Sequence, residues 1–142
     1  KTDEIPQTLR RILKMSLLIL LPILVFFVLF PQQIASIYTD DAALALKSVP
    51  VLYTIYVGAV VMAAAMIYFE FVSGTGNTFL ALVMETGVLV FYIIYIYLAT
   101  QVFCFPIRWV WCSEWVYSIL MLVASLVFMK IHPWREKTGV AV

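Results

Sequence analysis

Hydrophobic residues in this chain gather into long uncharged runs, and the charged and turn-forming residues lie between them. No charged residue occurs from Met15 to Thr39, a run of 25 positions, or from Ser48 to Phe69, a run of 22. A helix needs about 20 apolar residues to cross a hydrocarbon layer of about 30 Å. Each of these runs is therefore long enough to span a membrane as one helix.

Turn signals between the runs set the expected boundaries of four helices. Pro31 closes the first run, Asp40 and Asp41 are suited to cap the second helix, and Pro106 lies in a short hinge before the last. We therefore expect an all-α integral membrane protein. Its transmembrane helices are predicted at residues 8–30, 41–72, 78–102 and 109–131, and a cytoplasmic tail at 132–142.

The composition favours lipid as the surroundings of these helices. Hydrophobic residues make up 65% of the chain and charged residues 12%, and the mean hydropathy is +1.05. These proportions leave too little polar surface to cover a water-soluble globule. The net charge of +1 provides no basic field for nucleic acid. We expect the lipid bilayer, and no nucleic acid, as a partner.

Few side chains are suited to metal or enzyme chemistry. The chain has two cysteines, Cys104 and Cys112, and one histidine, His132, so no cluster of metal ligands is predicted. The glycine-rich stretch Gly74–Asn77 lacks the Gly-Lys-Ser/Thr ending of a phosphate-binding loop. We therefore expect neither an enzyme nor a cofactor, other than a transported or coupling ion.

Acidic residues at the edges of the apolar runs are the main functional candidates, because an ionisable group beside the bilayer core is expensive. On a 3.6-residue period, Glu70 shares a face with Met66, Ala63, Ala59 and Tyr56. Small residues let helices approach closely, so Glu70 is predicted to face protein rather than lipid. The alternative is that Glu70 only reaches to interfacial water.

Glu85 is the deepest acid of the chain. It lies seven residues into the third predicted helix, about 10 Å beyond the glycine-rich turn. Leu89 and Tyr92 fall on the same stripe, which gives the carboxylate a hydroxyl on its own face. Two interpretations stay open: a cation or proton site, or a protonated carboxyl that donates a hydrogen bond to a neighbouring helix.

A third polar stripe is predicted on the last helix. Glu114, Ser118, Met121 and Ser125 recur at helical spacing and are expected to face inward. Glu114 is the third carboxylate candidate, and its position near Arg108 also allows a purely structural role.

The basic residues predict the orientation in the membrane. Seven of the nine lie on one side of the predicted topology: Lys1, Arg10, Arg11, Lys14, Lys130, Arg135 and Lys137. By the positive-inside rule, both ends and the glycine-rich turn are cytoplasmic, in a multi-pass protein of the cell membrane. The chain begins at Lys1 without an initiator Met, and its polar leader is unlike a signal peptide. We expect a piece of a longer polypeptide.

Several motifs occur together in a fixed order. FEFVSGTGNT at 69–78 contains the turn of Gly74, Thr75, Gly76 and Asn77; IYTDD at 37–41 precedes it, and a tryptophan-rich opening, 109–117, follows. This set resembles the last four helices of the multidrug and toxic compound extrusion transporters, with the turn between their tenth and eleventh helices.

The resemblance implies a place in a C-terminal six-helix bundle that pairs with a second bundle formed by the missing N-terminal helices. It further implies efflux of amphipathic or cationic small molecules, coupled to Na⁺ or H⁺ antiport. Met62 stands about where some members of the family carry a coupling acid. Glu85 and Glu70 are therefore the first candidates for cation or substrate binding, with Tyr92, Tyr56, Met62 and Met66 as possible cavity wall.

Two other functional classes stay open. A lipid-linked oligosaccharide flippase would have a similar helix plan, but it is expected to line its cavity with Arg and Lys for pyrophosphate. A free-standing four-helix exporter that dimerises is the second alternative, and the residues upstream of Lys1 would separate it from the transporter.

Overall fold

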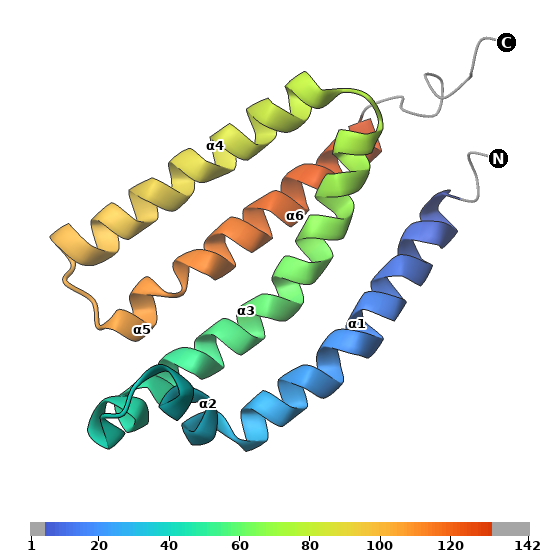
Figure 1. Ribbon diagram of the computed structural model, residues 1–142. Helices are drawn as coiled ribbons and strands as arrows, with labels where there is room; N and C mark the ends of the chain where they lie inside the picture. The colour runs from blue at the N-terminus through green and yellow to red at the C-terminus, as the bar shows by residue number, and fades with distance from the viewer. Residues whose placement is uncertain (1–4, 132–142) are drawn as a thin grey trace, which may run out of the picture.

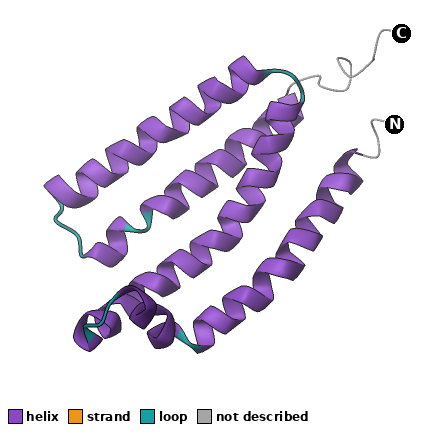
Figure 2. Cartoon of the chain, in the orientation of Figure 1, coloured by secondary structure: helices purple, strands orange, loops and turns teal. Residues whose placement is uncertain are grey.

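All regular structure in residues 5–131, the part of the chain that the computed structural model describes, is helical (Figure 2). Four spans are long and apolar enough to cross a membrane: Ile5–Leu29, Ala42–Gly74, Thr78–Val102 and Ile107–Ile131. The prediction of an all-α integral membrane protein with four transmembrane helices is confirmed. The predicted tail at 132–142, which includes His132, lies outside the described residues.

Shorter elements interrupt this simple plan. α1 (Ile5–Leu29) is followed by a short helix, α2 (Pro31–Tyr38), where the sequence indicated only a turn. α3 (Ala42–Gly74) and α4 (Thr78–Tyr97) follow, and α4 ends in a π-helical segment, η2 (Leu98–Val102). The last span consists of α5 (Ile107–Val110) and α6 (Ser113–Ile131). The helix expected at 109–131 is therefore divided after its first turn.

Helix ends are set by local chemistry that the sequence carries. The Asp41 carboxylate accepts hydrogen bonds from the backbone N–H groups of Ala43 and Leu44, at 2.8 and 3.2 Å, and so caps α3. Pro50 lies inside α3 and has no N–H to donate. Figure 1 shows the first turns of α3 set at an angle to the rest of the helix, as a proline in its interior explains.

The four spans lie side by side in the order α4, α6, α3, α1 (Figure 1), and contacts join each of these neighbouring pairs. The start of α1, the α3–α4 turn and the end of α6 lie at one end of the bundle, whereas α2 and α5 lie at the other. This arrangement agrees with the predicted topology, in which the spans alternate in direction.

The core lies where α6 packs between α3 and α4. One cluster joins Ala65 of α3, Val88 of α4 and Met121 of α6, and a second joins Val72, Ala81 and Phe128 from the same three helices. Small residues on α3 and α4 let α6 approach closely. The predicted inward stripe of α6 is confirmed, because its three members C-terminal to Glu114 are fully buried: Ser118, Met121 and Ser125.

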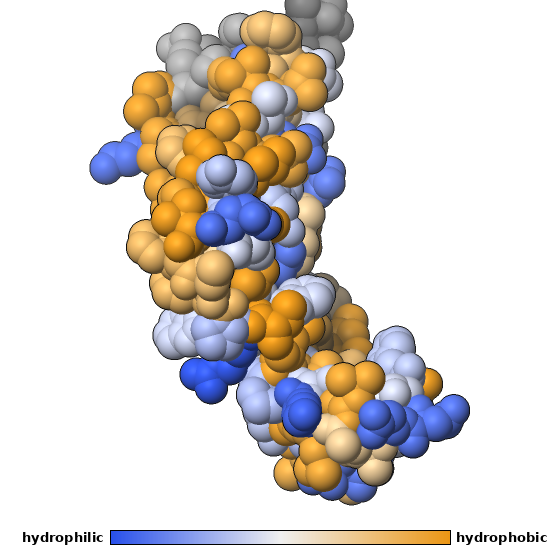
Figure 3. All heavy atoms as spheres, turned by 90° about the vertical axis from the view of Figure 1, so that its left-hand side faces the viewer, coloured by the Kyte–Doolittle hydropathy of each residue, from blue (hydrophilic) through white to orange (hydrophobic). Residues whose placement is uncertain are grey.

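Outside this core the helices expose apolar side chains. Leu9 is the only buried residue of α1, while Leu18 and Ile19 are 75% and 65% exposed. Hydrophobic side chains cover much of the face seen in Figure 3, with hydrophilic ones between them. Such a surface suits contact with lipid tails or with further membrane helices, and it does not suit water.

Candidate functional site

A tyrosine–glutamate pair joins two of the membrane spans. The Tyr92 hydroxyl of α4 donates a hydrogen bond to Oε1 of Glu114 in the first turn of α6, at 3.0 Å. Both side chains are half-buried. The sequence had proposed each residue as a candidate on its own helix, and the fold brings them together.

Further polar groups surround this pair. The Tyr117 ring meets the Tyr92 ring edge to face, with centroids 5.9 Å apart, and the Ser113 side chain, itself buried, also approaches the Tyr92 hydroxyl. We call these four residues, Glu114, Tyr92, Tyr117 and Ser113, the Glu114 cluster. A carboxylate that is hydrogen-bonded to one hydroxyl, with two more hydroxyl-bearing side chains nearby, has the donors and acceptors to hold a proton or a small cation.

Glu85 lies beside this cluster. The Tyr117 hydroxyl is within electrostatic reach of both Glu85 and Glu114. However, the Glu85 side chain is exposed in the described part of the protein and is not enclosed among packed helices there. The reason is its position on α4: it lies on the flank of the buried stripe that Ala81 and Val88 form, and not on the stripe itself.

Glu70 is also exposed, which corrects the prediction that it faces protein. The face of α3 that packs on the core carries Ala65 and Val72. Glu70 precedes Val72 by two residues, which turns it about 160° away around the helix. The prediction for Glu70 relied on small residues of α3 such as Ala63. Because Ala63, Ala64 and Ala65 are consecutive, small residues lie on several sides of the helix and do not define one packed face.

Of the four proposed cavity-wall residues, Tyr92 belongs to the Glu114 cluster, and the other three lie elsewhere on α3. Tyr56 is buried at 7% exposure and its ring contacts Phe27 of α1, with centroids 5.7 Å apart. It therefore belongs to the α1–α3 interface, where its buried hydroxyl has no hydrogen-bond partner among residues 5–131. Met62 is half-buried and Met66 is 36% exposed, both on α3.

The glycine-rich stretch forms the tight turn that the sequence predicted. Gly76 has a φ of 82°, a backbone conformation that glycine adopts without a steric penalty. The Thr75 hydroxyl donates to the Val72 carbonyl at 2.7 Å, and the Asn77 side chain accepts from the backbone N–H of Leu80 at 3.4 Å. Thr75 is thus the C-cap of α3, and Asn77 is the N-cap of α4. The cytoplasmic location of this turn, which consists of Gly74, Thr75, Gly76 and Asn77, stays a prediction.

Tryptophans stand next to the Glu114 cluster. Trp115 directly follows Glu114, and its indole N–H donates to the Thr54 carbonyl oxygen of α3 at 2.8 Å. Arg108, which the sequence had placed near Glu114, lies over the Trp109 ring, 5.6 Å from its centroid. The tryptophan-rich opening of the last span thus supplies specific contacts within the protein.

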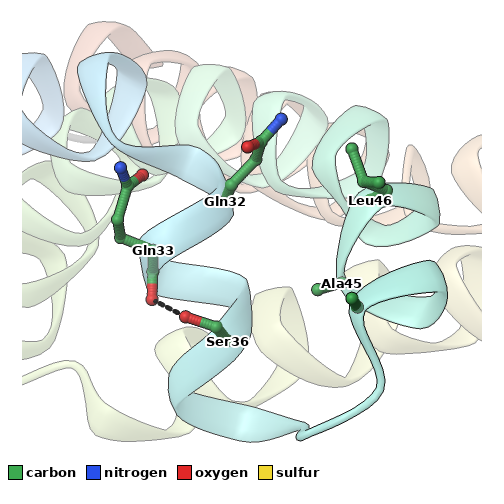
Figure 4. A pocket seen from close by; sticks show the side chains of 6 residues that line it. Gln32, Gln33, Ser36, Ala45 and Leu46 are labelled. Atoms are coloured by element: carbon green, nitrogen blue, oxygen red, sulfur yellow. Dashed lines mark hydrogen bonds between the residues drawn. The ribbon is translucent and has the colours of Figure 1, made fainter.

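Two hollows lie away from the acids. A pocket of about 300 Å³ opens between α2 and α3 and is lined by Gln32, Gln33, Ser36, Ala42, Ala45 and Leu46 (Figure 4). One polar side chain of the pocket is hydrogen-bonded within α2, since the Ser36 hydroxyl donates to the backbone carbonyl oxygen of Gln33 at 2.8 Å.

The second hollow is an apolar groove of about 330 Å³ between α4 and α6. It is lined by Val83, Met84, Gly87, Val88, Phe91, Leu120, Val123, Ala124 and Val127. Neither hollow is lined by Glu70, Glu85 or Glu114. Within residues 5–131, no group of three or more His, Cys, Asp or Glu side chains is placed to hold a metal ion.

The sequence contained a signal for the Tyr92–Glu114 pair that residue patterns on single helices missed. Tyr92 and Glu114 both lie eleven positions from Phe103, which stands in the hinge between two antiparallel neighbours. Residues that are equally far along the chain from such a hinge lie at a similar depth in the membrane, so Tyr92 and Glu114 are expected at the same level of their two helices. No comparable signal exists for the contact of Trp115 with Thr54, because the two residues are 61 positions apart.

Comparisons with known proteins gave one match. The family model described as MatE matches residues 1–98, which is 98 of the 142 residues. The matched region includes α1 to α4. Neither the curated proteins nor the solved structures gave a match.

Proposed function

We propose, from the premise that this chain belongs to the MatE family of multidrug and toxic compound extrusion transporters, that it exports amphipathic or cationic small molecules in exchange for Na⁺ or H⁺. Proteins of this family are membrane transporters and not enzymes. The four membrane-spanning helices agree with that membership.

The observation that carries the coupling proposal is the hydrogen bond between Tyr92 and Glu114. A carboxylate inside a membrane span is costly when it is left bare, and it is stabilised by a proton, by a metal cation or by a cationic substrate. When two of these compete for one site, binding of one releases the other. Competition at a single carboxylate is therefore sufficient to couple export of a cation to entry of an ion.

Glu85 extends the proposed path along α4. It lies seven residues from Tyr92, about 10 Å along the helix, and shares the electrostatic neighbourhood of Tyr117 with Glu114. We propose that Glu114 binds the coupling ion and that Glu85 receives it or the substrate on the side nearer the α3–α4 turn. Glu70, which lies on the side of α3 away from the core, takes no part in this path.

The direction of the path follows from the proposed orientation. Arg10, Arg11 and Lys14 of α1 and Lys130 of α6 lie toward the end of the bundle that carries the α3–α4 turn, and a basic end is typically cytoplasmic. Glu114 is in the first turn of α6, at the opposite end. It therefore lies in the half of the membrane from which an inwardly directed ion enters.

The exposed acids also support the participation of more helices than the four described. Glu85 and the apolar faces of α1 and α4 have no cover within residues 5–131. A second helical bundle facing them, as in the transporters that this chain resembles, would enclose Glu85 and form a substrate cavity.

The test is gradient-driven efflux of ethidium, a cationic dye, by the complete polypeptide in everted membrane vesicles. Either a Na⁺ gradient at constant pH or a pH gradient without Na⁺ is imposed. Glu114→Gln and Glu85→Gln should abolish or strongly reduce efflux while the amount of protein in the membrane is unchanged, and Glu70→Gln should retain it. Parental efflux by Glu114→Gln under both gradients would refute the proposal.

A further inference from the structure

We infer that Trp115 is a positioning residue for Glu114, because it anchors the first turn of α6 to α3 and so sets the affinity for the driving cation. This inference rests on the proposed function of Glu114. The two residues are adjacent, and their side chains bind different helices: Glu114 bonds to Tyr92 of α4, whereas Trp115 bonds to Thr54 of α3.

The contact between Trp115 and α3 is specific in its geometry. The indole Nε1–H donates to the Thr54 carbonyl oxygen at 2.8 Å. Thr54 is buried at 8% exposure, and its hydroxyl donates to the Pro50 carbonyl at 3.2 Å, one turn earlier in α3. The acceptor therefore belongs to a well-packed part of the helix, where a tryptophan usually has a partner for its N–H.

Gly58 makes room for the indole. A Cβ atom added at this position would lie 2.9 Å from both Cδ1 and Nε1 of Trp115, which is closer than carbon atoms can approach without displacement. The glycine is buried in the middle of α3, where its cost in helix propensity needs a compensating reason. The close approach of the indole to the α3 backbone is that reason.

The first turn of α6 needs such an anchor. The last span is interrupted between α5 and α6, at Trp111 and Cys112. The backbone N–H groups of Glu114 and Trp115 bond to carbonyls only three residues back, at 3.3 and 3.0 Å, which is a weaker pattern than that of an α-helix. The contact of Trp115 with Thr54 therefore gives this turn a fixed point on α3, in addition to the hydrogen bond of Glu114 to Tyr92.

The expected consequence concerns the affinity for the driving cation more than for the dye. A displaced Glu114 presents its carboxylate less well to the ion. Loss of one such hydrogen bond corresponds to about a fivefold change in an equilibrium constant. We therefore expect the KM for the driving cation to rise about fivefold, with a smaller change in the KM for ethidium.

The test compares Trp115→Phe and Gly58→Ala with Trp111→Phe in the vesicle assay above, using Na⁺ or H⁺, whichever drives the parent protein. Trp115→Phe removes the indole N–H that donates to the Thr54 carbonyl, and Gly58→Ala displaces the indole by adding a methyl group on α3. Trp111 lies one turn earlier and is 39% exposed, which makes it a matched control. KM does not depend on how much protein reaches the membrane, so it separates positioning from expression.

The inference is supported if both variants raise the KM for the cation and the double variant raises it no more than the larger single change, because both then act through one contact. A parental cation KM in Trp115→Phe or in Gly58→Ala, while Glu114→Gln remains inactive, overturns the positioning role and leaves the proposed function intact. An active Glu114→Gln variant refutes the proposed function, and the positioning role with it.

Discussion

Replacing Gly58 with alanine is expected to weaken the packing of α3 against α6. The substitution adds one methyl group at a buried position, where two atoms of the Trp115 ring would lie 2.9 Å from the new carbon. Those atoms are not free to move away, because Nε1 is hydrogen-bonded to the Thr54 carbonyl at 2.8 Å. Either this hydrogen bond lengthens or the two helices separate.

The magnitude is a difference between two opposing effects. In a helix interior, alanine is favoured over glycine by about 1 kcal/mol. Inserting an extra carbon into a well-packed contact costs about 1–3 kcal/mol, and loss of the indole hydrogen bond costs about 1 kcal/mol more. We expect the steric effect to exceed the propensity gain, so that the free energy of unfolding falls by about 1–3 kcal/mol.

Unfolding of the purified protein by SDS in mixed micelles, followed by circular dichroism, measures this change. Gly87→Ala is the matched control, since Gly87 is also in a helix interior but a Cβ there would meet nothing within 4 Å. It should be neutral or stabilising by up to about 1 kcal/mol. If Gly58→Ala stabilises as much as Gly87→Ala, the close contact of the indole with α3 is refuted. In a Trp115→Phe background the destabilisation by Gly58→Ala should shrink.

Three further predictions concern single side chains. Tyr92→Phe removes the hydroxyl that donates to Glu114 and should raise the KM for the driving cation about fivefold in vesicles; an unchanged KM would separate the tyrosine from ion binding. Met121→Ala empties a fully buried position and should lower the free energy of unfolding in SDS by about 2–5 kcal/mol, whereas Val123→Ala, at a 49% exposed site, should cost far less. Asp41→Ala deletes the cap of α3 and should cost about 1 kcal/mol in the same titration, while Asp41→Asn, which keeps the acceptor oxygen, should cost little.

The Glu114 cluster places polar side chains at the start of α6, within a span that is long and apolar enough to cross a membrane. Ser113 and Glu114 begin α6 next to Tyr92, and Trp115 fixes the same turn to α3. Consecutive side chains of a helix project about 100° apart, so Glu114 and Trp115 reach two different helices from one turn. Changes in this turn are therefore expected to affect transport more than changes in the middle of α6, whose side chains pack in the core.

The sequence alone determined the four membrane spans, the glycine-rich turn that contains Gly76, an acidic cap of α3 at Asp40 or Asp41, and the buried stripe that includes Met121. These features depend on local properties, namely the length of an uncharged run, the conformational freedom of glycine, the reach of a capping carboxylate and the period of a helix. None of them requires knowledge of which neighbouring helix packs against which face.

The tertiary structure decided which carboxylate acquired a partner. α3 and α4 are apolar around most of their circumference, so their residue patterns do not define which side faces a neighbour. Two separate contacts of α6 show the rotations that result: Trp115 packs on Gly58 of α3, where Glu70 points outward, and Glu114 bonds to Tyr92 of α4. In lipid, where either side of such a helix is acceptable, close packing between helices determines that rotation and polarity does not.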